Sequence, residues 1–144
     1  MEKCFAIEEK DIKELIRSAV MARNMAYARY SGFKVGAALL AQPGRIFTGC
    51  NIENSSYGAT ICAERAAVCN AVSSGYSDFK AIAIVGGLGS TGISGITYPC
   101  GICRQVLSEF SPDMYVIAAK SEDDYDMRKL SEFLPASFDA GQMK

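Results

Sequence analysis

Histidine is absent from this sequence of 144 residues. Its absence excludes Ser/His and Cys/His nucleophile pairs, histidine-ligated metals and an imidazole base that titrates near neutral pH. Any acid–base chemistry must therefore use a carboxylate, lysine, tyrosine or cysteine side chain. An excess of charge is also missing, because 15 lysine and arginine residues face 16 aspartate and glutamate residues. With no positive field to hold a phosphate backbone, we expect no nucleic-acid partner.

The chain also lacks a long apolar run. Its first residues mix charges where a signal peptide would be apolar, and no later run approaches the length of a membrane span. We therefore expect a cytoplasmic protein with no membrane partner. No repeat or linker divides the chain, and its hydrophobic content of 49% suffices for one core, so we predict a single domain over residues 1–144.

Hydrophobic periodicity predicts an alternation of helices and strands. The predicted helices span residues 8–28, 62–74 and 100–110, and the predicted strands span 35–41, 45–50, 80–85 and 114–119. We expect loops at 51–60 and 86–98, a solvated acidic turn at 122–126, and a fifth strand with a short helix near 130–134. This order favours a layered α/β domain around a mixed sheet that opens with an antiparallel hairpin.

Six cysteines need an explanation, since a chain of this length needs no disulfides and a reducing compartment disfavours them. Three of them lie in two informative stretches, Cys62-Ala63-Glu64-Arg65 and Pro99-Cys100-Gly101-Ile102-Cys103. Cys100 and Cys103 share one face of a helix, and Cys62 lies where a loop meets a predicted helix start. The other cysteines, Cys4, Cys50 and Cys69, are more simply structural.

These residue types indicate a catalytic zinc site. Three thiolates about 2.3 Å from Zn²⁺ leave a fourth position open for water, as catalytic zinc sites do. Arg65 returns to the side of Cys62 after one helical turn, where it can hydrogen-bond the sulfur and offset the surplus negative charge. Attack of zinc-activated water on an amidine-like carbon needs a group that carries a proton to the leaving nitrogen, and Glu64 is the candidate.

Spacing alone leaves other interpretations open. Cys62 could belong to a core stripe of its helix, while Cys100 and Cys103 form a redox dithiol that would oxidise reversibly and ignore chelators. A zinc-stabilised binding module would instead have a closed four-ligand site and no role for Glu64. Residues 87–92 match the G-x-G-x-x-G pattern of dinucleotide sites, but no helix opens at their end, so we expect no dinucleotide.

Five ordered stretches resemble cytidine deaminases of the small, tetrameric class: residues 30–39, 49–54, 62–65, 99–106 and 134–138. The resemblance implies a three-layer α/β/α fold with a five-stranded mixed sheet. It also implies one zinc ion per subunit, bound by Cys62, Cys100 and Cys103, with Glu64 as the catalytic proton carrier. Water activated by zinc would add to C4 of cytosine before ammonia leaves, converting cytidine and 2′-deoxycytidine to their uridine counterparts in pyrimidine salvage.

The resemblance assigns further residues to the nucleoside and to the subunit junctions. Asn51 and Glu53 match the pair that holds the ribose 3′-hydroxyl, and their amide and carboxylate suit that task. Arg65 and Gln105 match residues that contact the thiolates. The remaining matches are Phe33, which packs on the substrate, and the Ala63 backbone, which contacts the pyrimidine. Phe138 matches an aromatic residue that reaches into a neighbouring subunit's site, and Tyr57 matches a substrate-binding residue at the subunit junction of a homotetramer.

Two positions depart from the family pattern. Arg29 stands where proline often precedes Tyr-Ser, and we expect it to alter only a loop. Tyr98 stands where a small serine usually precedes Pro-Cys, beside the side from which ammonia leaves, so we expect a change of shape there. An aminonucleoside antibiotic or cytosine within a nucleic acid are alternative substrates, but Asn51 and Glu53 favour a free nucleoside, because a held 3′-hydroxyl leaves no room for a continuing strand.

Overall fold

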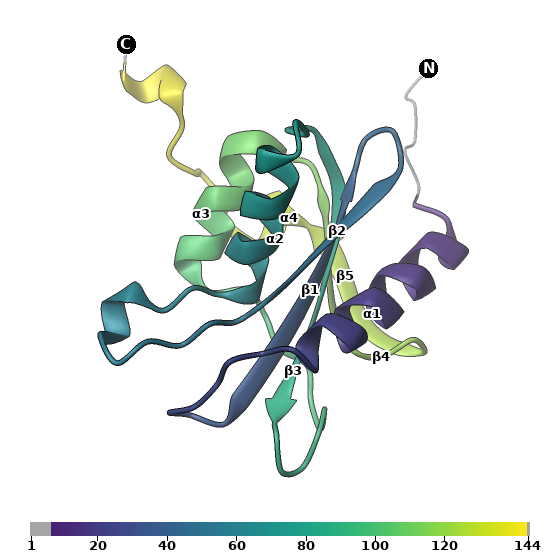
Figure 1. Cartoon of the computed structure of the whole chain (residues 1–144). Coiled ribbons are helices and arrows are strands. Elements are labelled where there is room, and N and C mark those ends of the chain that lie inside the picture. Colours follow the sequence, from purple (N-terminus) through teal and green to yellow (C-terminus); the bar gives the residue numbers. More distant parts are fainter. Residues whose placement is uncertain (1–6, 144) are drawn as a thin grey trace.

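A mixed five-stranded sheet forms the centre of the computed structural model, which describes residues 7–143. Cys4 lies outside this range. The strands follow the order β2–β1–β3–β4–β5, with β3 and β4 parallel and the other pairs antiparallel (Figure 1). Their bounds are β1 (Phe33–Ala41), β2 (Arg45–Cys50), β3 (Phe79–Leu88), β4 (Tyr115–Ser121) and β5 (Asp124–Lys129).

Helices cover both faces of the sheet (Figure 1). On one face lies α1 (Glu9–Arg23), and on the other lie α2 (Ala63–Ser73), α3 (Gly101–Phe110) and α4 (Leu130–Phe133). Successive strand residues point to opposite faces, so Leu39 and Ile82 pack toward α2 whereas Leu40 and Ala83 pack toward α1. The predicted three-layer α/β/α fold with a five-stranded mixed sheet is confirmed. Two single-turn elements complete the structure, η1 (Tyr57–Ala59) and η2 (Ala140–Met143).

Glycines let both helical layers approach the sheet closely. A Cβ atom at Gly36 of β1 would collide with the carbonyl oxygen of Ala19 in α1. A Cβ atom at Gly49 of β2 would collide with the backbone of α2 at Ala63 and Ala67. The start of α2, and with it the residues that follow Cys62, is therefore held against the sheet by backbone contact.

Two element ends differ from the prediction. The first helix ends at Arg23 instead of residue 28, because the backbone of Tyr27 instead pairs with Asn51 and Glu53 after β2, at 3.0 and 2.8 Å. The predicted strand at 80–85 extends to Leu88 as β3, since β1 pairs with it as far as Phe33 opposite Leu88. Part of the predicted glycine-rich loop is therefore strand.

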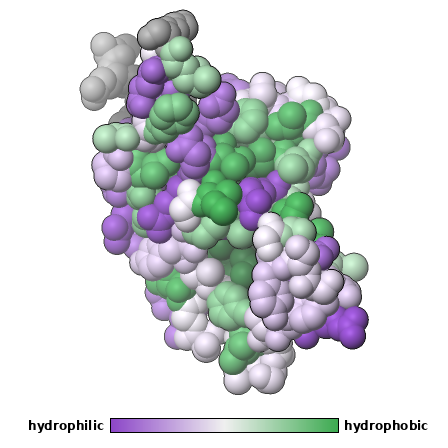
Figure 2. Space-filling view, turned by 90° about the vertical axis from the view of Figure 1, so that its left-hand side faces the viewer, coloured by the Kyte–Doolittle hydropathy of each residue, from purple (hydrophilic) through white to green (hydrophobic). Residues whose placement is uncertain are grey.

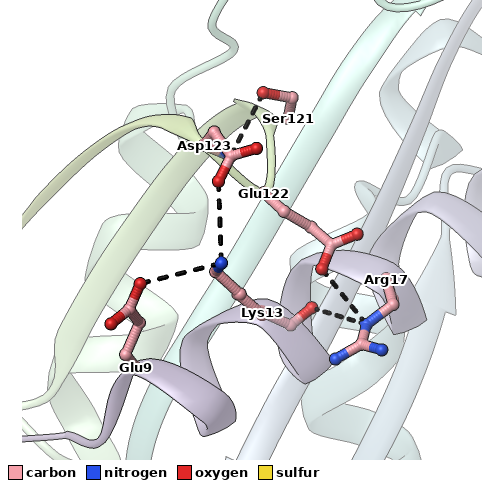
Figure 3. A network of polar contacts seen from close by, with 6 residues as sticks. All are labelled: Glu9, Lys13, Arg17, Ser121, Glu122 and Asp123. Atoms are coloured by element: carbon pink, nitrogen blue, oxygen red, sulfur yellow. Dashed lines mark hydrogen bonds and ion pairs between the residues drawn. The ribbon is translucent and has the colours of Figure 1, made fainter.

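The acidic segment is a third difference. Residues 124–126, predicted within a solvated turn, belong to β5, which pairs with β4 at the edge of the sheet. Charged residues are frequent on exposed edge strands, where they hinder unwanted pairing, and they resemble a solvated turn in sequence. The turn itself contacts α1, where Glu122 pairs with Arg17 at 3.3 Å and Asp123 with Lys13 at 3.6 Å (Figure 3).

The short helix predicted near residues 130–134 is present as α4. Within residues 7–143, none of the helices has both the length and the apolar character that crossing a membrane requires.

Candidate metal centre and active site

Two helix starts bring the predicted cysteines together. Cys62 is the N-cap of α2, Cys100 is the N-cap of α3, and Cys103 lies buried in the first turn of α3. Both N-cap residues have extended backbone, so their sulfurs lie beside the helix N-termini, where the helix dipole favours a thiolate. The position of Cys62 just outside the helix also explains how Cys62 and Glu64, two residues apart, can face one point.

The distances between the sulfurs fit zinc. All three Sγ atoms lie within 4.8 Å of one another, and those of Cys62 and Cys100 are 3.7 Å apart. Sulfurs bound to one tetrahedral zinc at about 2.3 Å lie about 3.8 Å apart, which matches that pair. Cys50 and Cys69 are outside this group, which is the one metal-ligand cluster of three or more within the described residues. Cys62, Cys100 and Cys103 could therefore hold a zinc ion as three thiolates, and a tetrahedral ion held in this way would accept water as its fourth ligand.

Arg65 contacts the cluster as its spacing predicts. Its Nη2 donates to Cys62 Sγ at 3.5 Å and to the carbonyl oxygen of Thr60 at 3.3 Å. Hydrogen bonds from Cys103 and Arg65 lower the pKa of the Cys62 thiol to about 5. The pKa of Cys103 is raised, because it donates to the Cys62 sulfur and is buried. Cys62 therefore ionises before Cys103, and Arg65 supplies the adjacent positive charge.

Glu64 is buried beside these sulfurs. Only 4% of the residue is exposed, and burial is the main reason why the pKa of its carboxyl is raised to about 7. A carboxyl that titrates near neutral pH can both accept and return a proton under working conditions. Glu64 lines a cavity of about 200 Å³ together with Cys62 and Cys100, and we call it the catalytic cavity.

The catalytic cavity adjoins a second hollow. The other residues that line the catalytic cavity include Asn51, Thr60, Ala63, Thr97 and Tyr98. The second hollow, of about 350 Å³, is lined by Glu53, Tyr57 and their neighbours, and it shares Thr60 with the catalytic cavity. The structure therefore places Asn51, Ala63 and Glu64 around one space and Glu53 and Tyr57 around the next.

Asn51 and Glu53 both support the backbone that leads into β1. Asn51 is 8% exposed, and its amide accepts from the Val35 N–H at 2.9 Å and donates to the Phe33 carbonyl at 2.8 Å. Glu53 accepts from the backbone of Tyr30 and from the backbone and hydroxyl of Ser31. Hydrogen bonds from Ser31 and Tyr30 hold the pKa of Glu53 below its usual value. Both side chains keep hydrogen-bonding capacity for a ligand.

The other aromatic candidates lie at the surface. Phe33 begins β1, and its ring lies against Gly86 of β3. Tyr57 is 78% exposed and Phe138 is 57% exposed. The Gln105 amide donates to the carbonyl of Phe138 at 2.9 Å, and within the described residues its side chain makes no hydrogen bond to a cysteine sulfur. Gln105 is thus hydrogen-bonded to the C-terminal segment, and its contact with the thiolates stays a prediction.

Sequence reasoning missed Arg104. Its Nε donates to the carbonyl of Pro99 at 2.8 Å and its Nη1 to the carbonyl of Phe133 at 2.9 Å. The guanidinium therefore ties the residue before Cys100 to α4. In the sequence, the position of Arg104 one helical turn after Cys100 indicates that it lies near the site. Its contact with the Phe133 carbonyl in α4 can be known only from the fold.

Comparison with known proteins assigns the family. A model described as the cytidine and deoxycytidylate deaminase zinc-binding region matches residues 9–119. The chain belongs to this deaminase family. A cytidine deaminase from Sporosarcina psychrophila is 45% identical over 129 residues, which cover 89% of this chain and 91% of that protein. The crystal structure of a cytidine deaminase from Burkholderia pseudomallei superposes with a TM-score of 0.79 at 44% identity, covering 87% of this chain and 97% of that one.

A relative of another name matches at lower identity. A blasticidin-S deaminase from Bacillus cereus is 34% identical over 118 residues, covering 80% of this chain and 83% of that protein. The family and the sulfur geometry together make this member of the zinc-binding deaminase family a hydrolytic enzyme with zinc as its cofactor. They contradict the redox-dithiol and binding-module interpretations.

Proposed function

We propose that residues 1–144 form one deaminase domain that hydrolyses free cytidine and 2′-deoxycytidine to uridine and 2′-deoxyuridine, with release of ammonia, in pyrimidine salvage. One observation carries the proposal: three cysteine sulfurs cluster at zinc-compatible spacing, and two of them, those of Cys62 and Cys100, line a cavity with a buried carboxyl that titrates near pH 7. The 45% identity to a named cytidine deaminase supports the choice of base.

In this proposal Cys62, Cys100 and Cys103 hold the metal and Glu64 moves the proton. Zinc, when bound, supplies a Lewis acid that lowers the pKa of water. The Glu64 carboxylate takes a proton from the attacking water and returns it to the departing nitrogen as the C4–O bond forms and the C4–N bond breaks. Arg65 helps to keep Cys62 ionised, and its own positive charge offsets part of the negative charge of the thiolates.

The junction between the catalytic cavity and the neighbouring hollow suits the sugar, because Asn51 lines the first and Glu53 the second. Glu53 remains ionised and can accept from the 3′-hydroxyl, while Asn51 has a second amide hydrogen and a second lone pair to offer. Phe33 packs on the substrate and the Ala63 backbone contacts the pyrimidine edge. Because this grip acts at the 3′ position, ribose and deoxyribose nucleosides are both accepted.

An aminonucleoside antibiotic is the second candidate substrate. The 34% identity to a blasticidin-S deaminase favours it, and Tyr98 adds a departure from the family pattern beside Cys100. Direct comparison of the two substrates separates the candidates.

We also propose that the enzyme acts as a homotetramer in the cytoplasm, with Tyr57 at the subunit junction and Phe138 completing the site of a neighbouring subunit. Large apolar side chains are exposed on the elements concerned: Tyr57 at 78%, Ile102 at 62% and Phe138 at 57%. Figure 2 looks onto the side where α3 and η1 lie in Figure 1 and shows hydrophobic patches among polar residues. Exposed apolar patches commonly mark protein interfaces.

The test compares wild type with Glu64→Gln, Cys100→Ala and the surface control Glu109→Gln. Ammonia release and loss of ultraviolet absorbance are measured with cytidine, deoxycytidine, cytidine 5′-phosphate and blasticidin S, and bound zinc is quantified. We expect Glu64→Gln to keep zinc and lose at least about 100-fold in kcat, and Cys100→Ala to lose zinc and activity together. Zinc-loaded wild type that converts neither nucleoside would refute the proposal.

A further inference from the structure

Tyr98 connects the catalytic cavity to the edge of the sheet. The residue lines the cavity, and its hydroxyl donates to Oδ2 of Asp126 in β5 at 2.7 Å. Its ring packs against Phe133 of α4, with ring centroids 5.6 Å apart. The segment that enters the site before Cys100 is thus attached to elements near the end of the chain.

Asp126 is itself firmly held. Arg128 donates to both of its carboxylate oxygens, at 3.0 and 2.8 Å, and such bidentate pairs fix orientation as well as charge. The Arg128 guanidinium also lies 5.2 Å from the centroid of the Phe133 ring. The hydrogen bonds from Arg128 and Tyr98 lower the pKa of Asp126, so it remains an ionised acceptor at neutral pH.

A second connection runs through the next residue. Arg104 donates to the Pro99 carbonyl at 2.8 Å and to the Phe133 carbonyl at 2.9 Å. Tyr98 and Pro99, the two residues that precede Cys100, are therefore each tied to the region of Phe133. Because Cys100 is an N-cap, the hydrogen bonds of α3 do not fix its N-terminal side, and its sulfur depends on this segment for its place.

We propose that Tyr98 and Asp126 are positioning residues for the metal ligand Cys100. The hydrogen bond between them holds residues 98–100 so that Cys100 Sγ stays at the spacing from Cys62 Sγ that a tetrahedral zinc site requires. The proposal rests on the metal site of the proposed function and is independent of the substrate. It gives a purpose to a tyrosine where the family usually has a small residue.

The experiment measures zinc binding, not only turnover. Tyr98→Phe keeps the ring but removes the hydroxyl, and Asp126→Ala removes the acceptor. Asp126→Asn keeps an oxygen acceptor, while Asp124→Ala is the matched control on the same strand. For each protein the zinc dissociation constant is determined by competition with a chelator, and the cobalt-substituted form gives the thiolate-to-cobalt absorption that reports ligand geometry. Thermal unfolding confirms that each variant is folded.

We expect Tyr98→Phe and Asp126→Ala each to raise the zinc dissociation constant about tenfold and to shift the cobalt absorption. The double variant should lose no more than either single variant, because both remove one hydrogen bond. Asp126→Asn should recover part of the affinity, and Asp124→Ala should match wild type.

Three results would overturn the proposal: wild-type zinc affinity and cobalt spectrum in both single variants, an equal loss in Asp124→Ala, or losses that add in the double variant. Zinc-loaded wild type that fails to deaminate cytidine would end the proposed function and leave these measurements unaffected.

Discussion

At the scale of single residues, Asn51 has a structural task as well as the proposed one. Its amide bridges the backbone of Phe33 and Val35 at the start of β1, and it does so while almost fully buried. These two hydrogen bonds also fix the orientation of the Asn51 amide, which the proposed contact with the substrate requires. The family motif predicts the contact of Asn51 with the substrate, but it does not predict that Asn51 supports the backbone of β1.

Replacement of Asn51 therefore costs stability. In Asn51→Ala the Val35 N–H and the Phe33 carbonyl lose their partner, and leaving such groups unpaired costs about 1–3 kcal/mol. Chemical denaturation should show this loss in the free energy of unfolding. Asn70→Ala is the control, because its exposed amide makes one contact, to Thr48 at 3.3 Å, and we expect a change below about 0.5 kcal/mol. Equal effects in both variants would contradict the structural role.

Glu64 and the cysteines show what residue types alone reveal. The absence of histidine directs attention to carboxylates, and the motif that begins with Cys62 singles out Glu64 among them. Burial, which raises the pKa of Glu64 to about 7, depends on the packing of α2 against the sheet and is invisible in the sequence. The contact between Arg65 and Cys62 follows from helical spacing, whereas the partner of Gln105 depends on where the C-terminal segment returns.

At the scale of elements, α1 and β1 approach so closely that Gly36 cannot carry a side chain. In Gly36→Ala the new methyl group would meet the backbone of Ala19 and Arg23, which cannot rotate away. We expect the free energy of unfolding to fall by about 1–3 kcal/mol, the usual range for overpacking. Gly44→Ala is the matched control, since open space surrounds that position. A stability in Gly36→Ala equal to that of the control would show that the helix can move away.

The elements were predictable where burial leaves a periodic pattern. Both helices that carry the site and the strands β1 to β4 follow from apolar spacing, because each of them buries at least one side in the core. The fifth strand expected near residues 130–134 lies earlier, at Asp124–Lys129, and was not predicted there because most of its residues are charged and resemble a solvated turn. The end of α1 could not be predicted either, because the sequence after Arg23 could continue as helix. The backbone of Tyr27 instead pairs with the segment after β2.

At the scale of the whole molecule, the centre is assembled from distant parts of the chain. Cys62 and Cys100 are 38 residues apart and meet because α2 and α3 start at the same end of one layer. The hydrogen bond from Tyr98 to Asp126, 28 residues later in the chain, connects the centre to β5 as well. The three candidate metal ligands lie in short sequence motifs, but the distances between their sulfurs depend on the complete fold.

In the proposed tetramer, each site also includes a residue from a second chain. The Phe138 ring is exposed, and its backbone is held by Gln105, so its side chain is presented at the surface from a fixed support. If Phe138 completes the site of a neighbouring subunit, Phe138→Ala should reduce kcat/KM about tenfold, as loss of a buried interface aromatic does. Sedimentation should give a mass four times that of the chain.

Mixed oligomers test this arrangement directly. A subunit with Phe138→Ala still carries Glu64, and a subunit with Glu64→Gln still carries Phe138, so a site that combines the two is intact. After unfolding and joint refolding at equal amounts, random assembly makes about a quarter of all sites intact, and activity should rise to that fraction of wild type. Mixing Glu64→Gln with Cys100→Ala is the control, because both defects fall within one subunit's own site and no intact site can form. If activity does not rise in the first mixture, Phe138 acts within its own subunit or not at all.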